Sequence, residues 1–237
     1  MDEDLDLEAL AEYLHLDPAQ VSRLVERGNL PGRRVSGQWR FSRPEVTFWL
    51  ERRIGASDDD AELAQVEDAM QRGGDPRVDD LLPVSQLLPV EAMAVPLLAR
   101  TRISVISSMV ELAGSTGWLW DVPRMEEAVR AREDLFPTAL ENGVAMMHPR
   151  RPLPSIVGQP FIAFGRTERG IPFGASGGGL TDLFFLLCSV NDRGHLHALA
   201  RLSRLIGDAD FLAQLRGVPD ARTAHEVLQA REAALLD

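Results

Sequence analysis

His148 is the residue whose type and position in this sequence best suit chemistry. It follows a turn signal at Asn142-Gly143 and the short apolar run Val144–Met147, which is typical of a strand. The end of a strand holds a side chain rigidly and can still leave it exposed. Because a neutral imidazole carries a lone pair near pH 7, His148 could attack a phosphoryl group or accept a proton. The alternative for any single histidine is a surface position without a chemical role.

A second motif, Gly174-Ala-Ser-Gly-Gly178, formally matches the nucleophile elbow of α/β-hydrolases, with Asp182 and His195 following in the expected order. An elbow requires a strand before the serine and a helix after it. Here Ser176 lies in a glycine-rich turn that leads into an apolar run, so we interpret the segment as a hairpin connection. The turn also lacks the Lys-Ser/Thr ending of a phosphate-binding loop.

His195 and His197 raise the question of a metal site. Neighbours two residues apart on a helix point to different faces, and no cysteine or third histidine is spaced to complete a ligand set. We therefore predict neither a metal nor another cofactor, and we expect His197 to be exposed.

The composition predicts a soluble protein with one large or two small domains, since the chain has 237 residues and 45% hydrophobic content. The single cysteine, Cys188, lies in an apolar run, which favours a buried, unreactive thiol and a reducing cytoplasm. The acidic start of the chain is unlike a signal peptide, and no apolar run is long enough to span a membrane. A net charge of -11 restricts any DNA contact to a local basic surface.

The first 53 residues contain the elements of a small domain. Helical periodicity over Leu7–Leu14 is followed by a second helix, which Asp17-Pro18-Ala19-Gln20 starts and Gly28 ends. Two short strands around Ser36-Gly37 predict a hairpin. Ser42-Arg43-Pro44-Glu45 predicts the start of a third helix.

Two stretches of this segment, Asp17-Pro-Ala-Gln-Val-Ser-Arg-Leu-Val-Glu-Arg-Gly-Asn-Leu-Pro-Gly and the later Arg-Val-Ser-Gly-Gln-Trp-Arg-Phe, resemble the excisionase/MerR-type winged helix-turn-helix family. In that family the second helix enters the major groove and the wing contacts backbone phosphates. The resemblance implies DNA contacts from Gln20, Ser22, Arg23 and Arg27 on the helix and from Arg33, Arg34 and Arg40 on the wing. A module that binds protein is the alternative, because acidic residues near the start of the chain oppose DNA.

A connector joins this module to the rest of the chain. Ser57-Asp58-Asp59-Asp60 and the spacing of Leu63, Val66 and Met70 predict a helix. This helix could pack on either domain or pair with its copy in a homodimer. We divide the chain into a helix-turn-helix domain at residues 1–54, a linker at residues 55–81 and a second domain at residues 82–237.

The second domain is predicted to be α/β, with a mixed sheet flanked by helices. Apolar spacing predicts helices over Thr101–Gly114, Pro123–Glu133, His195–Ile206 and Thr223–Leu236, of which the last two close the chain. In addition to Val144–Met147, strands are predicted over Ile156–Arg166 and Thr181–Val190.

Three segments of this domain carry a family likeness. They are Arg132-Glu133 ahead of Thr138–His148, Gly170-Ile-Pro-Phe-Gly-Ala175 ahead of Asp182-Leu-Phe-Phe-Leu-Leu, and His195-Leu-His-Ala-Leu-Ala-Arg-Leu-Ser-Arg-Leu-Ile. Together they resemble the type-2 enzyme IIA domain of the bacterial phosphotransferase system, over about residues 82–236. The His195-Leu-His197 form is most similar to the nitrogen-related, regulatory branch.

The resemblance implies that His148 accepts a phosphoryl group from an HPr-like phosphocarrier. His195 would hold the phosphate or orient His148, and Arg132 would neutralise charge on the phosphoryl oxygens. Such a transfer needs an aligned nucleophile and positive donors more than covalent help from the protein. The chain departs from the family pattern at Met147, where proline is usual, and at Ala139-Leu140-Glu141, where Gly-Ile-Gly is usual.

The sequence as a whole predicts a cytoplasmic bacterial regulator. Phosphorylation of His148 would change what the helix-turn-helix domain does with DNA or with a regulatory protein target. The alternative is a binding protein whose IIA-like domain docks a partner without phosphoryl transfer, and whose helix-turn-helix binds DNA or protein.

Overall fold

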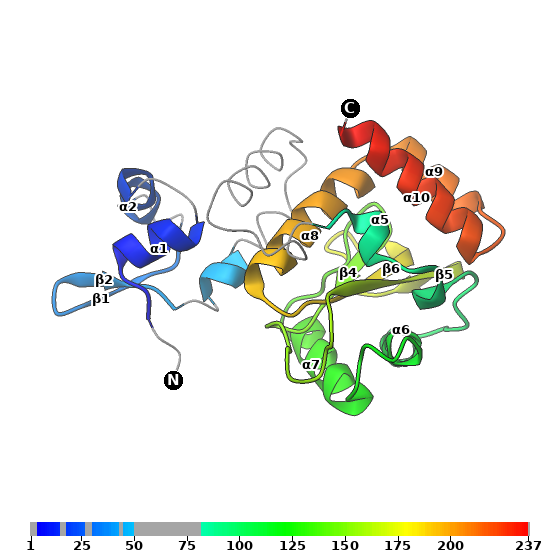
Figure 1. The fold of residues 1–237 in the computed structure, drawn as a ribbon, viewed down its shortest axis with the longest axis horizontal. Helices are drawn as coiled ribbons and strands as arrows, with labels where there is room; N and C mark the ends of the chain where they lie inside the picture. Colours follow the sequence, from blue (N-terminus) through cyan, green and yellow to red (C-terminus); the bar gives the residue numbers. More distant parts are fainter. Residues whose placement is uncertain (1–3, 15–17, 27–29, 43–44, 50–81, 237) are drawn as a thin grey trace.

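The computed structural model of the protein describes residues 4–14, 18–26, 30–42, 45–49 and 82–236 (Figure 1). The predicted linker and its helix lie outside these residues. Within them, no helix combines the length and the apolar character needed to cross a membrane.

The N-terminal part has the predicted helices and hairpin. Helices α1 (Leu7–Leu14) and α2 (Pro18–Glu26) precede strands β1 (Arg33–Val35) and β2 (Gln38–Arg40), which pair antiparallel. Ser36 and Gly37 both have positive φ, at 50° and 83°, which is the backbone of a two-residue hairpin turn. Residues 45–49 are helical and belong to the predicted third helix. Apolar side chains from these elements form the small core, namely Leu10, Ala11, Val21, Val25, Leu30, Phe41 and Val46.

A mixed four-stranded sheet forms the centre of the C-terminal part. Its strands are β3 (Met93–Ala94), β4 (Val144–Met147), β5 (Phe161–Pro172) and β6 (Leu180–Cys188), in the spatial order β3-β5-β6-β4. β5 and β6 pair antiparallel, whereas β4 runs parallel to β6 and β3 runs parallel to β5. The predicted mixed sheet is therefore confirmed.

Helices cover both faces of this sheet, as Figure 1 shows. Helices α6 (Arg102–Ser115) and α7 (Val122–Leu135) lie on one face. The other face carries α5 (Val84–Leu87), α8 (Asp192–Ile206), α9 (Ala209–Gly217) and α10 (Ala221–Leu236), and the short 3-10 helix η2 (Val90–Ala92) precedes β3. In β6, Leu183, Phe185 and Leu187 face α8, whereas Phe184 and Leu186 face α6 and α7. Burial on both faces explains the nearly unbroken apolar run.

Two predicted elements differ from the structure. The strand expected at Ile156–Arg166 begins only at Phe161, because Ile156 and Val157 turn back to donate hydrogen bonds to Leu153 O, at 3.0 and 3.1 Å. Both helices predicted to close the chain are present as α8 and α10, but the prediction missed α9, which lies between them. Asp208 caps α9, and its carboxylate accepts from the backbone N–H groups of Asp210 and Phe211.

Candidate functional site

The topology brings the end of β4 and the end of β6 to the same edge of the sheet, because the two strands are parallel. His148 follows β4 directly and Ser189 follows β6 directly. α8 starts three residues after Ser189, with Asn191 as its N-cap, and brings His195 to this edge in its first turn. Side chains at carboxyl ends of parallel strands are a common position for binding and catalytic groups in α/β proteins.

His148 and His195 form a close ring pair. Their ring centroids are 4.9 Å apart and their planes meet at 63°. Each residue is only 2% exposed, so His148 is buried, although a strand end can leave a side chain exposed. Residues alternate along β4, and His148 lies on the side of Val144 and Met146, which is the face that α8 covers.

Hydrogen bonds define the tautomer of His148. Its Nδ1 lies 2.9 Å from the carbonyl oxygen of Met146, which can only accept, so Nδ1–H donates. In the neutral ring the lone pair is then on Nε2. Nδ1 of His195 lies 3.0 Å from Oγ of Ser189, a hydroxyl that can donate or accept. If Ser189 donates, His195 carries its proton on Nε2, where it can serve as a hydrogen-bond donor.

Arg132 and Glu133 lie in the last turn of α7 and organise the segment that leads to β4. Arg132 is 3% exposed, and its Nη1 donates to the carbonyl oxygen of Phe136 at 2.6 Å. Glu133 is fully buried and accepts from both the backbone N–H and the hydroxyl of Thr138. Burial raises the pKa of the Glu133 carboxyl, and the Thr138 bonds and neighbouring arginines oppose this shift. The carbonyl of Thr138 in turn accepts from Met146 N, two residues before His148.

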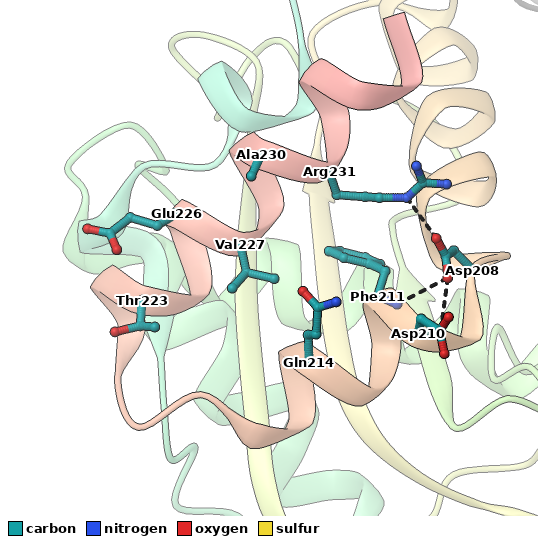
Figure 2. Close-up of a pocket in the computed structure, with 9 residues that line it drawn as sticks. All are labelled: Asp208, Asp210, Phe211, Gln214, Thr223, Glu226, Val227, Ala230 and Arg231. Atoms are coloured by element: carbon teal, nitrogen blue, oxygen red, sulfur yellow. Dashed lines mark hydrogen bonds and ion pairs between the residues drawn. The ribbon is translucent and has the colours of Figure 1, made fainter. Parts of the chain in front are cut away.

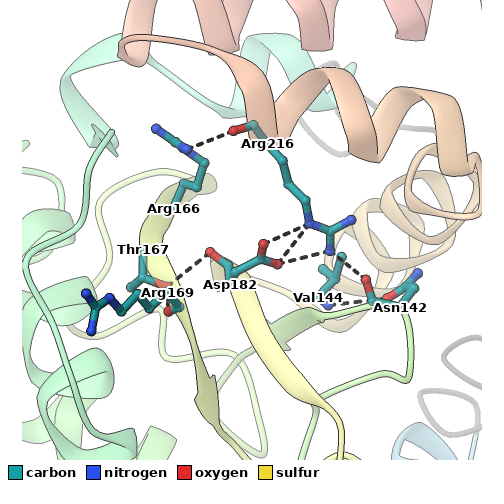
Figure 3. Close-up of polar contacts among 7 residues, drawn as sticks. All are labelled: Asn142, Val144, Arg166, Thr167, Arg169, Asp182 and Arg216. Atoms are coloured by element: carbon teal, nitrogen blue, oxygen red, sulfur yellow. Dashed lines mark hydrogen bonds and ion pairs between the residues drawn. The ribbon is translucent and has the colours of Figure 1, made fainter.

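A polar anchor fixes the other end of β4 (Figure 3). Arg216 of α9 makes a two-pronged ion pair with Asp182 of β6, with Nε–Oδ2 at 2.8 Å and Nη2–Oδ1 at 3.0 Å. Its Nη2 also donates to the carbonyl of Asn142 at 2.6 Å. Gly143 has φ +84°, and a Cβ there would lie 2.7 Å from Arg216 Nη2. The Asn142-Gly143 turn signal thus marks a site where only glycine fits easily.

The hydrolase alternative does not fit this geometry. Ser176 Oγ donates to Glu141 Oε1 at 3.1 Å, Asp182 is paired with Arg216, and His195 is paired with Ser189. The three residues of the formal motif therefore have separate partners. The glycine-rich segment joins the antiparallel strands β5 and β6, which confirms the predicted hairpin connection.

His197 and Cys188 belong to the packing. His197 is buried, which contradicts the expected exposure, because α8 is covered on both of its sides. Burial lowers the pKa of His197, and Arg193 adds to this shift, whereas Glu232 opposes it. Cys188 is buried as predicted, and burial raises the pKa of its thiol. Among the residues that the structure describes, no group of three His, Cys, Asp or Glu side chains could hold a metal ion.

A pocket of about 430 Å3 lies between α9 and α10, and neither His148 nor His195 lines it (Figure 2). Two of the four charged side chains in its lining, Asp208 and Arg231, pair with each other. Asp208 caps α9, and Arg231 Nε lies 3.0 Å from Asp208 Oδ2. The residues that line the pocket include no histidine and no cysteine, so the histidine pair remains the candidate site.

Most of the residues predicted to contact DNA lie on helix α2 or on strands β1 and β2. Arg23 is exposed on α2, and Ser22 Oγ donates to Glu26 at 3.4 Å. Gln20 lies in α2, and Arg27 falls outside the described residues.

The wing arginines have partners within the domain. Arg33 is exposed and pairs with Asp4 at 2.6 Å, and Asp4 raises its pKa. Arg34 stacks over the ring of Trp39, with 5.0 Å from Cζ to the ring centroid. Arg40 donates to Gln38 at 3.2 Å. A DNA phosphate would compete with Asp4 for Arg33, so Asp4 would weaken a contact of Arg33 with DNA.

Ser189 and Thr138 are the site residues that sequence reasoning did not identify. Ser189 is a polar residue directly after a buried strand, and Thr138 lies five residues after Glu133. The position of Ser189 at a strand end was a usable signal. Its pairing with His195 depends on how α8 crosses the sheet edge, which the sequence does not display.

The sequence model of the family described as "Phosphoenolpyruvate-dependent sugar phosphotransferase system, EIIA 2" matches residues 86–231. The chain belongs to this EIIA 2 family. A model described as "Helix-turn-helix domain" matches residues 5–54, so the EIIA 2 domain is joined to a helix-turn-helix domain.

Individual relatives agree with the family match. A "Nitrogen regulatory protein" of Bradyrhizobium diazoefficiens is 33% identical over 151 residues, which are 62% of this chain and 95% of that protein. The nitrogen regulatory protein IIA-Ntr of Neisseria meningitidis has a TM-score of 0.55 at 24% identity, covering 61% of this chain and 98% of that chain. Enzyme IIA-mannitol of Escherichia coli, solved in complex with phosphorylated enzyme IIB-mannitol, has a TM-score of 0.52 at 19% identity, covering 61% of this chain and 99% of that chain. The matched part of this chain therefore has the same fold as these two structures.

Proposed function

We propose that this EIIA 2 protein is a bacterial regulator in which His148 accepts a phosphoryl group from an HPr-like phosphocarrier. The observation that carries the proposal is the hydrogen bond from His148 Nδ1 to Met146 O at 2.9 Å. This bond leaves Nε2 as the nucleophile in the neutral ring and holds the ring at the end of a rigid strand.

The proposed step is a transfer between two histidines. The lone pair of His148 Nε2 forms a bond to phosphorus while the bond from phosphorus to the carrier's histidine nitrogen breaks. The bonding electron pair returns to that carrier nitrogen. Little covalent help is required, so catalysis consists of alignment and stabilisation of charge on the phosphoryl oxygens.

The neighbouring groups supply that stabilisation in our proposal. His195, oriented by Ser189 at 3.0 Å, donates from its Nε2. Arg132 contributes a guanidinium whose planar fork suits phosphoryl oxygens. The first turn of α8 adds backbone N–H groups at the positive end of the helix dipole.

The test is transfer of label from phosphoenolpyruvate through the general phosphotransferase enzyme and an HPr-type carrier. We expect acid-labile, base-stable phosphate in the wild type and none in His148→Ala. His225→Ala is a matched control, since His225 is a partly buried histidine on α10 whose Nε2 pairs with Ser85 O at 3.1 Å. Label that persists in His148→Ala would place the phosphoacceptor elsewhere.

The helix-turn-helix domain would turn the phosphorylation state into a change in DNA binding or in contact with a regulatory protein. Exposed Arg23, Arg33 and Arg34 support a local DNA contact. Direct measurement compares DNA retention by the wild type with that by an Arg23→Ala, Arg34→Ala double variant at low salt. Equal retention would exclude these arginines as the DNA surface.

A second candidate is a docking protein that does not transfer phosphate. It is favoured by the burial of His148, His195 and Arg132, each at most 3% exposed, because a carrier must reach the attacking nitrogen. Failure of every carrier tried to label the wild type would support this candidate over phosphoryl transfer.

A further inference from the structure

The third helix of the helix-turn-helix domain contacts the C-terminal end of α7 in the EIIA 2 domain, at Arg132 and Phe136. Phe48, in the helical residues 45–49, packs edge-on against Phe136, with ring centroids 6.3 Å apart and an interplanar angle of 85°. The guanidinium carbon of Arg132 lies 5.1 Å from the centroid of the same Phe48 ring. In Figure 1 this short light-blue helix is the part of the N-terminal domain drawn next to the C-terminal domain.

The contact involves the residue proposed to neutralise the phosphoryl oxygens. Arg132 already donates to the carbonyl of Phe136 at 2.6 Å, and Phe48 lies over its guanidinium. A cation on an aromatic face is attracted by the ring, so the pair is favourable. An incoming phosphoryl group would have to approach a guanidinium that is 3% exposed.

The two histidines of the site are as little exposed as Arg132 is. Transfer between two proteins requires the attacking nitrogen and the phosphorus to approach within about 3–3.5 Å. His148 and His195 are each 2% exposed, so a carrier cannot reach them without a rearrangement. Residues 45–49 of the third helix are no part of the four-stranded sheet, so their displacement would leave the strand pairing of the sheet intact.

We infer that the third helix covers the phosphoryl-transfer site, with Phe48 on Arg132 as the contact that a phosphocarrier must displace. This inference rests on the proposed function and names its regulation. Docking of the helix-turn-helix domain and phosphorylation of His148 are then mutually exclusive. A phosphohistidine recruits Arg132 away from Phe48, so phosphorylation releases the helix-turn-helix domain.

The exposed apolar side chains beside this contact suit binding of a carrier protein and also binding of the third helix. Leu135 is 58% exposed and Phe136 is 45% exposed, although large apolar side chains are usually buried. Both lie at the end of α7, directly beside Arg132. Phe136 therefore serves the third helix in the closed state and remains available to a protein partner once Phe48 leaves.

The experiment uses the full chain with Phe48→Ala, and Phe48→Trp as the variant that keeps an aromatic face. Val35→Ala is the control, because Val35 is an exposed apolar residue in the wing of the same domain. Loss of the ring contacts should accelerate labelling of His148 about five- to thirtyfold at limiting carrier, given the usual strength of such contacts. Phe48→Trp and Val35→Ala should label at the rate of the wild type.

A second readout follows the contact without phosphate. The amide of Phe136 donates to Arg132 O at 3.2 Å at the end of α7, and its hydrogen exchange should rise about tenfold in Phe48→Ala. Phosphorylation of the wild type should raise this exchange in the same way.

The two readouts separate failure of the inference from failure of the proposed function. Phosphate labelling of Phe48→Ala but not of the wild type supports the inference that the third helix covers the site. Faster labelling of Phe48→Ala than of the wild type supports it as well. Equal labelling of the wild type and Phe48→Ala overturns the cover and leaves phosphoryl transfer intact. If neither is labelled by any carrier, the proposed function fails, and protection of Phe136 that depends on Phe48 would then assign the contact to fixed packing between domains.

Discussion

Removal of the Ser189 hydroxyl tests how the histidine pair is oriented. Ser189 Oγ and His195 Nδ1 are 3.0 Å apart, and both residues are buried. In Ser189→Ala, His195 Nδ1 loses this partner in a place that water does not readily reach. Loss of one buried hydrogen bond costs about 1–2 kcal/mol, which corresponds to about five- to thirtyfold in rate if it falls on the transition state.

The expected result is a phosphoryl-transfer rate lowered by that factor, with the affinity for the carrier little changed. The reason is that Ser189 touches His195, and His195 in turn orients the phosphoryl group. Ser189→Thr keeps the hydroxyl and should restore most of the rate. NMR of nitrogen-15-labelled histidine should show a change in the tautomer of His195 in Ser189→Ala.

Ser203→Ala is the matched control. Ser203 and Ser189 are both 7% exposed, but Ser203 Oγ contacts the sulfur of Met146, at 3.8 Å, where Ser189 Oγ contacts His195. The Ser203→Ala variant also removes a serine hydroxyl, and it should leave the transfer rate unchanged. Ser189 does not orient His195 for transfer if Ser203→Ala slows transfer as much as Ser189→Ala does, or if Ser189→Ala transfers at the wild-type rate.

Three further predictions concern stability. Gly143→Ala should lower the free energy of unfolding in urea by about 2 kcal/mol, because a side chain at φ +84° is strained and meets the Arg216 guanidinium; Gly178→Ala, at φ +69° in open space, should cost less, and equal losses would contradict the steric account. Arg216→Met should cost about 1 kcal/mol, since its pair with Asp182 is two-pronged but one-third exposed, and should speed amide exchange in β4; unchanged exchange there would argue against anchoring. The folded-state pKa of His197 is lowered, so wild-type stability is full above its unfolded value of 6.5 and falls as pH drops below it, by at most about 1.4 kcal/mol per pH unit. His197→Gln should flatten this fall between pH 7 and pH 5, and parallel stability curves would exclude His197 as its source.

Local patterns were enough to predict most of the elements. The apolar alternation and spacing gave the helices α6, α7 and α10 and the strands β4 and β6 to within a few residues. These predictions succeed because helix caps and side-chain periodicity act over a few neighbouring residues. Short α9 escaped prediction because it buries few apolar residues, although its cap at Asp208 was visible in the sequence.

The sequence by itself determined that the chain combines a helix-turn-helix module with an α/β domain carrying a histidine after a strand. Only the tertiary structure decided how that histidine is surrounded. The parallel pairing of β4 with β6 puts Ser189 beside the histidine pair, and the packing around α8 buries His148 and also His197, which was expected to be exposed. The contact of Phe48 with Arg132 joins residues 84 positions apart, and no local pattern encodes it. Burial and pairing over such separations depend on how whole elements pack, and that packing is a property of the complete chain.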